Sequence, residues 1–132
     1  MYTEENVNTP TQNATSRIRY EIEDAFIRIG IPSNLKGWDY TVSAITMVVV
    51  DRNVIHSITA GMYRALAEIY NTSHTCVERG ICHLIETAYE RGNQSELEKC
   101  VGYANPKTGK LANSEFISNF AKHIWYKIYG YN

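Results

Sequence analysis

Apolar residues recur with a helical period along most of the chain. In residues 77–88 they stand at positions i, i+4, i+7, i+8 and i+11, which places them on one face of a helix. Similar stripes precede Gly30 and follow Leu111. The three stripes consist of Ile18, Ile22, Ala25, Phe26 and Ile29; Val77, Ile81, Leu84, Ile85 and Ala88; and Phe116, Ile117, Phe120, Ala121, Ile124, Trp125 and Ile128. We therefore predict three amphipathic helices around a common core.

Polar segments and turn residues predict the boundaries of these helices. Residues 1–15 are rich in Thr, Asn and Glu and nearly devoid of apolar residues, so we expect a disordered polar arm. Ser16 is a candidate cap for the first helix, which Gly30 would end. We predict a short helix over 96–101, a loop over 102–110 and a last helix that is capped at Asn113-Ser114 and ends near Gly130.

Residues 38–50 have an ambiguous period. The run TMVVV within them favours a strand, but a single strand in a helical chain has no partner for its backbone groups. A buried helix is therefore favoured, broken by residues 51–53. Residues 54–57 are expected to form a connector, and Thr59 can cap the next helix. The predicted fold is all-α: a compact five- to six-helix domain over 16–130.

Residues 59–91 have the pattern of a helix-turn-helix. Leu66, Ala67 and Tyr70 share one face of a short helix, and the polar triplet 71–73 separates it from a longer helix. In this triplet Asn71 tolerates the left-handed conformation, and Thr72 or Ser73 can cap the second helix. The pattern is typical of domains that insert the second helix into a DNA groove, although any small helical bundle can contain such a pair.

The outward face of the second helix carries the candidate chemistry. Opposite the apolar stripe lie Thr75, Arg79, Cys82, His83 and Glu86, with Glu78 at the flank. An arginine can donate two hydrogen bonds to guanine, and a glutamate can accept one from cytosine, but a Glu-Arg pair is also common on solvated helices. Hydroxyl groups at the helix start can contact phosphate or simply cap the helix, and His83 can bind phosphate or be a plain surface histidine.

Charge weighs against a nucleic-acid binder. The 132-residue chain has a formal net charge of −1 and a sequence pI near 6.4, whereas most DNA-binding domains are basic. The charge is uneven, because from Lys99 onward five lysines stand against one acid, and the rest holds eight basic residues and thirteen acids. The tail therefore either faces phosphate or is an ordinary solvated surface.

Other classes of function find little support in the sequence. Three cysteines without framework spacing and the lack of a signal segment indicate a reduced, cytoplasmic protein. Cys76, Cys82 and His83 lie within two helical turns, but their spacing is not that of a metal site. We find no nucleophile-base pair or phosphate-binding loop, so we expect no enzyme and no cofactor. No apolar run approaches the roughly 18 residues of a membrane span.

Several blocks of sequence resemble a known family. They are KGWDYTVSAITMVV, SIT, NTS, VERGICHLIETAYERGN, VGY and NSEFIS, which occur in this order between about Ile27 and Ile124. The chain resembles the C-terminal DNA-binding domain of the master sporulation response regulator of spore-forming Firmicutes, the stage 0 sporulation protein A family. The resemblance implies a six-helix domain that binds the major groove, assembles head-to-tail on tandem DNA sites and contacts the sigma subunit of RNA polymerase.

The resemblance also implies particular site residues. The triplet Val77-Glu78-Arg79 matches the start of the recognition helix, about residues 74–91, in which the Glu and the Arg contact bases. Together with the outward-face analysis this gives a predicted DNA-binding set of Ser73, His74, Thr75, Glu78, Arg79, Cys82 and His83. The element Arg91-Gly92-Asn93 and the segment after it match the sigma-contacting region, which here consists of Gln94, Ser95, Glu96 and Glu98.

Two departures from the family pattern bear on function. The family usually has an arginine where this chain has Cys82, so one cationic DNA contact is lost. Family members also carry a receiver domain, whereas this chain starts with Met1 and a short arm, so we expect control without a phosphorylated aspartate. The leading hypothesis is a sequence-specific DNA-binding regulator. The alternative is a protein-interaction module that has lost DNA binding and modulates a full-length homologue.

Overall fold

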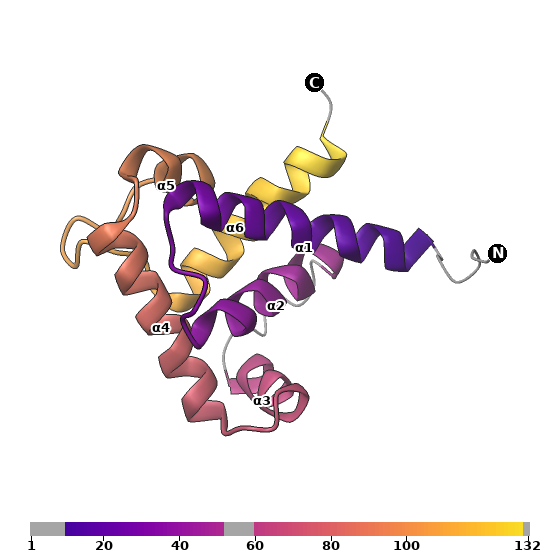
Figure 1. Ribbon diagram of the computed structural model, residues 1–132. Helices are drawn as coiled ribbons and strands as arrows, with labels where there is room; N and C mark the ends of the chain where they lie inside the picture. The colour runs from indigo at the N-terminus through magenta and orange to yellow at the C-terminus, as the bar shows by residue number, and fades with distance from the viewer. Residues whose placement is uncertain (1–9, 52–59, 131–132) are drawn as a thin grey trace.

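The computed structural model describes residues 10–51 and 60–130; the predicted connector at 54–57 and the cap at Thr59 fall outside these ranges. The described residues form six α-helices and no strand (Figure 1). The all-α prediction is thus confirmed. The helices are α1 (Pro10–Ile29), α2 (Gly37–Val50), α3 (Ala60–Ile69), α4 (His74–Arg91), α5 (Gln94–Val101) and α6 (Asn113–Tyr129).

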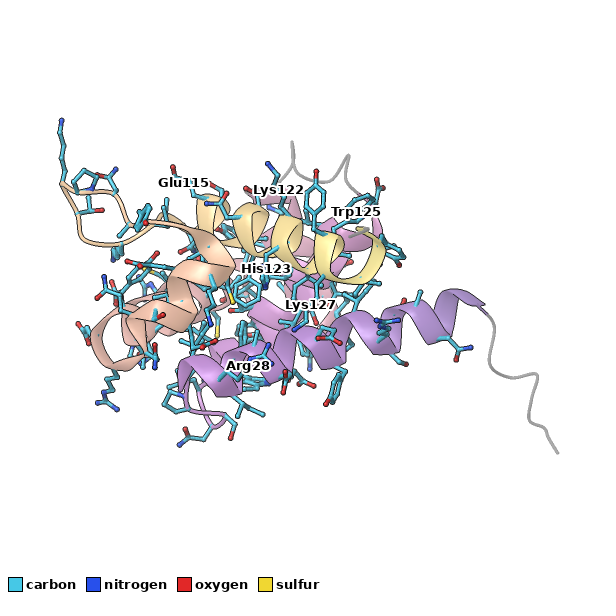
Figure 2. All side chains as sticks on the ribbon, turned by 90° about the horizontal axis from the view of Figure 1, so that it is seen from above. Arg28, Glu115, Lys122, His123, Trp125 and Lys127 are labelled. Atoms are coloured by element: carbon cyan, nitrogen blue, oxygen red, sulfur yellow. The ribbon has the colours of Figure 1, made fainter. Side chains whose placement is uncertain are left out.

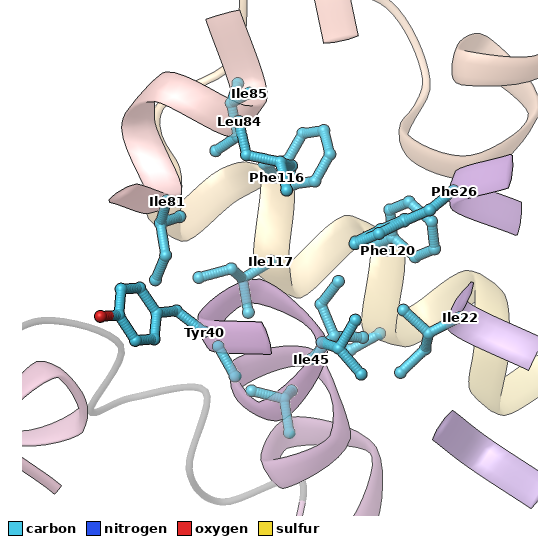
Figure 3. Packing of buried hydrophobic residues seen from close by; sticks show 14 of the residues in the cluster. Ile22, Phe26, Tyr40, Ile45, Ile81, Leu84, Ile85, Phe116, Ile117 and Phe120 are labelled. Carbon is cyan, nitrogen blue, oxygen red and sulfur yellow. The ribbon is translucent and has the colours of Figure 1, made fainter. Parts of the chain in front are cut away.

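Helices α2 and α6 form the centre of the domain. Helix α2 packs mainly on α4 and α6, α1 crosses α2, and α3 and α5 lie at opposite ends of α4 (Figure 1). Phe26 of α1 meets Phe120 of α6 and Trp38 of α2 edge-on, with ring centroids 5.3 and 5.1 Å apart. Ile45 of α2 and Ile81 of α4 belong to the same buried cluster, in which α2, α4 and α6 pack together (Figure 3). All three predicted stripes contribute to this single core.

Helix α2 confirms the helical interpretation of the TMVVV run. It is buried on most of its circumference, so its apolar residues need no one-sided period. Its two buried threonines find acceptors inside the helix: the Thr41 hydroxyl donates to the Gly37 carbonyl at 2.6 Å, and the Thr46 hydroxyl donates to the Val42 carbonyl at 2.7 Å. A central helix rather than a strand therefore satisfies both the backbone and the polar side chains.

Some helix starts differ from the predictions. Helix α1 begins at Pro10, so Ser16 lies inside the helix and the polar residues 10–15 are helical. Proline suits the first helical position because its fixed φ and missing N–H cost nothing there. Helix α5 starts at Gln94, two residues early, because the Asn93 side chain accepts the Glu96 backbone N–H at 3.0 Å.

The start of α6 is held in an unexpected way. Ala112 occupies the cap position, and its backbone N–H donates to the Glu115 carboxylate at 3.2 Å. Asn113, predicted as part of the cap, is the first helical residue, and its side-chain amide turns to α3 and α4. Of the predicted inward residues of α6, Trp125 and Ile128 are only half-buried.

Candidate nucleic-acid interface

The turn between α3 and α4 has the predicted chemistry. Asn71 has a φ of 53°, in the left-handed region, and the Thr72 N–H donates to the Ala67 carbonyl at 2.9 Å. The Ser73 side chain caps α4 by accepting the Cys76 backbone N–H at 3.1 Å. A reversal of a few residues thus fixes the start of α4 relative to α3.

Contacts of Tyr70 and Cys76 hold this turn and the start of α4 against α2. The Tyr70 and Ser43 hydroxyls lie 2.6 Å apart, and the Tyr70 ring meets Tyr40 edge-on at 5.3 Å. The Tyr40 hydroxyl lies 3.7 Å from the sulfur of Cys76, in the first turn of α4. Hydrogen bonds from Thr72 and Tyr40 lower the pKa of the Cys76 thiol. The contact between Tyr40 and Cys76, together with burial, raises the pKa of the Tyr40 hydroxyl. The N-terminal turn of α4 is therefore anchored from both neighbouring helices.

The two faces of α4 separate as predicted. Val77, Ile81, Leu84, Ile85 and Ala88 are all buried. On the other face Ser73, His74, Thr75, Glu78, Arg79 and His83 are exposed, and Cys82 is partly exposed. The structure thus brings the seven predicted DNA-binding residues together along the first half of α4. Among the described residues, the Arg79 and His74 side chains have no hydrogen bond or ion pair.

A groove of about 860 Å³ runs along this exposed face. One wall is α4 itself, with Thr75, Glu78, Arg79 and Cys82. The opposite wall was not predicted from the sequence. It is formed by Tyr63 of α3, by Lys110, Leu111 and Ala112 before α6, and by Asn113 and Ser114 at the start of α6.

Two side chains of the segment around the start of α6 contact α3 and α4. The Asn113 amide donates to the Tyr63 hydroxyl at 3.2 Å and to the Glu78 backbone carbonyl at 3.3 Å. The Lys110 ammonium group lies 2.7 Å from the Glu86 carboxylate in an ion pair whose side chains are 35% and 42% exposed. These contacts hold the α5–α6 loop against α4.

The ion pair also shifts the ionisation of the groups around it. The hydrogen bond and charge of Lys110 lower the pKa of Glu86, and Glu86 raises the pKa of Lys110. The Cys82 thiol, which donates to Glu86 at 3.7 Å, has a pKa raised by burial and by the nearby carboxylate. At neutral pH charged Glu86 and Lys110 therefore lie beside a neutral Cys82 thiol at the edge of the groove.

The lysines of the basic C-terminal segment do not share one face. Lys110 lines the groove with Arg79, whereas Lys127 pairs with Glu21 of α1 at 3.2 Å and Lys99 pairs with Glu96 of α5 at 3.2 Å. The groove thus contains basic groups from α4 and from the α5–α6 loop next to one acid of α4, Glu78. It is neither uniformly basic nor uniformly acidic.

The segment predicted to contact the sigma subunit lies elsewhere. Gln94, Ser95, Glu96 and Glu98 belong to α5, at the end of α4 that is opposite to the turn (Figure 1). Gln94 and Ser95 are exposed, and the Gln94 amide donates to the Glu98 carboxylate at 3.1 Å. The two predicted site sets are therefore separated by the second half of α4.

The architecture defines the chain as a helix-turn-helix domain with an anchored second helix and an open face on it. The family of this domain is "Sporulation initiation factor Spo0A C terminal", whose model matches residues 22–124, and the chain belongs to that family. The domain that defines this family is a non-catalytic, helix-turn-helix DNA-binding domain of a sporulation regulator. The resemblance of the sequence blocks is thereby confirmed.

Residues 10–51 and 60–130 contain neither a metal-ligand cluster nor a membrane-spanning helix. In these ranges no three His, Cys, Asp or Glu side chains are grouped as metal ligands. Likewise, none of the helices described there has the length and apolar character that a membrane span requires.

Proposed function

We propose that this chain is a cytoplasmic, sequence-specific DNA-binding transcription regulator whose helix α4 enters the major groove of double-stranded DNA. One observation carries the proposal: α4 is anchored by its buried stripe, and its opposite face presents Arg79, whose side chain has no partner within residues 10–51 and 60–130, next to Glu78. Membership of a DNA-binding family supports it. A rigid helix with a free guanidinium group is suited to read base edges.

The residues of the exposed face take different roles in this proposal. Arg79 donates to the N7 and O6 atoms of a guanine, and Glu78 accepts from the amino group of a cytosine. Ser73, His74, Thr75 and His83 contact phosphates at the edges of the groove. Cys82 lies between these groups and provides no positive charge, so it contributes contact area and not phosphate affinity.

The experiment compares Arg79→Ala with the wild-type protein by fluorescence anisotropy, on the preferred duplex and on a random one. Loss of a bidentate base contact should cost about 1–3 kcal/mol on the preferred duplex and little on the random one. His83→Ala is the matched control, because it should weaken both duplexes alike. An equal loss on both duplexes with Arg79→Ala would reject this residue as a base reader.

We further propose that the domain binds tandem sites as a head-to-tail homodimer and that α5 contacts the sigma subunit of RNA polymerase. The exposed Gln94 and Ser95 and the half-exposed Glu96 and Glu98 support a polar contact surface away from the DNA face. Glu98→Lys should weaken binding to the purified sigma subunit and leave DNA affinity unchanged, because it reverses one charge at this surface. Unchanged sigma binding would reject the role of α5.

A further inference from the structure

Lys110 occupies a fixed place beside the exposed face of α4. The loop that carries it is closed by its own hydrogen bonds: the Gly109 N–H donates to the Asn105 carbonyl at 2.8 Å, and the Thr108 hydroxyl donates to the Lys110 carbonyl at 2.8 Å. The Asn113 contacts then fix the following residues against α3 and α4. The Lys110 ammonium group is thus held next to α4 by a defined turn.

The position of this loop matters once α4 enters DNA. An α-helix with its side chains is about 10–12 Å across, and the major groove is about 12 Å wide. The helix therefore fills the groove, and an element that flanks it meets the phosphates of one strand. Residues 110–114 flank α4 along the groove that contains Thr75, Glu78 and Arg79.

The partner of Lys110 is a group that phosphate can replace. The Glu86 carboxylate binds the ammonium group at 2.7 Å, and both side chains remain more than one third exposed. An exposed ion pair of this kind contributes little free energy, because water and salt screen it. A phosphate offers the same ammonium group an oxygen acceptor of the same charge sign, together with release of counterions from DNA.

From this geometry we infer that Lys110 is a phosphate-binding residue of the DNA interface and that Glu86 competes with the phosphate for its ammonium group. The inference rests on the proposed function, since it names a further contact of the same site. Glu86 acts as an internal substitute for the DNA backbone: it holds Lys110 in position in the free protein and lowers the net affinity that Lys110 adds for DNA of any sequence.

The test measures salt dependence of binding to labelled random and preferred duplexes for four forms of the full chain: wild type, Lys110→Gln, Glu86→Gln and the double variant. Lys110→Gln should weaken both duplexes alike and reduce the slope of log affinity against log salt by about 0.9, the value for one phosphate contact. Glu86→Gln should strengthen binding to both duplexes, and this gain should disappear in the double variant.

Lys127→Gln is the matched control, because it removes the same charge from an ion pair on the α1 side of α6. If Lys110→Gln behaves like this control while the wild type binds DNA, the inference is overturned and the proposed function stands. If Glu86→Gln strengthens binding equally with and without Lys110, Glu86 repels DNA directly and the competition is overturned. If the wild type binds neither duplex, the proposed function and the inference both fail. Circular dichroism confirms that each variant is folded.

Discussion

At the scale of single residues, folding changes the ionisation of His123. It belongs to α6, meets the Phe120 ring edge-on at 6.4 Å, and faces the side on which α1 carries Arg28 (Figure 2). Burial, followed by the positive charges of Lys127 and Arg28, lowers the pKa of His123 below its ordinary value of 6.5. The folded protein therefore favours the neutral imidazole.

This predicts a loss of stability in mild acid. Below about pH 6.5 the unfolded chain binds a proton at this histidine that the folded chain resists, so the free energy of unfolding should fall between pH 7 and pH 5.5. Aspartates and glutamates ordinarily titrate below that window. Urea titrations should show a flatter pH dependence for His123→Gln than for the wild type. His83→Gln, which removes an exposed imidazole instead, serves as the control.

Single residues also show what local sequence can and cannot predict about the site. The exposed positions of Arg79 and Glu78 could be predicted because they follow from the helical period of the buried stripe on the same helix. Lys110 and Asn113 could not, since their contacts to Glu86 and Glu78 join residues 24 and 35 positions apart. Such contacts depend on how the α5–α6 loop packs, and no periodic pattern encodes that.

At the scale of secondary-structure elements, α4 is positioned by a close crossing with α2. The two helices meet at Gly37 and Gly80, where a Cβ atom on Gly37 would overlap the Gly80 carbonyl oxygen. A Cβ atom on Gly80 would lie 2.9 Å from a ring carbon of Tyr40, the residue that also contacts Cys76 at the start of α4. Helix α4 can therefore take this position only because both crossing residues lack side chains.

Gly37→Ala should consequently destabilise the domain by about 1–3 kcal/mol, because the added methyl group forces the backbones of α2 and α4 apart. Gly61→Ala is the matched control: a Cβ atom at that position of α3 meets no atom within 4 Å, so stability should be unchanged or slightly increased. Chemical denaturation of the three proteins measures both effects. A wild-type midpoint for Gly37→Ala would contradict the described crossing.

Whole elements were easier to predict than their limits. The stripes of α1, α4 and α6 were evident from sequence, and α2 could be assigned because a single strand would have had no partner. The early start of α1 at Pro10 was missed, since polar residues with no apolar stripe resemble a disordered segment. The cap of α6 was misassigned because the Asn113 side chain bonds across the groove instead of to its own helix.

At the scale of the whole molecule, α4 separates two surfaces with different character. The groove with Arg79 and Lys110 lies along its first half. Helix α5, which carries exposed polar residues, follows its C-terminal end (Figure 1). A formal net charge of −1 is compatible with DNA binding if the basic groups are concentrated where DNA approaches. DNA affinity should then depend on few basic residues, and because the salt slope grows with the number of phosphate contacts, its salt dependence should be modest.

The central claim, that α4 reads DNA sequence, is tested most directly by selecting bound duplexes from a random pool with the full chain and with Arg79→Ala. We predict that the wild type enriches a motif that contains a guanine at one fixed position. The variant should still bind DNA but should lose the preference for guanine at this position. A wild-type pool without any enriched motif would contradict the claim and would favour a domain that binds protein instead of DNA.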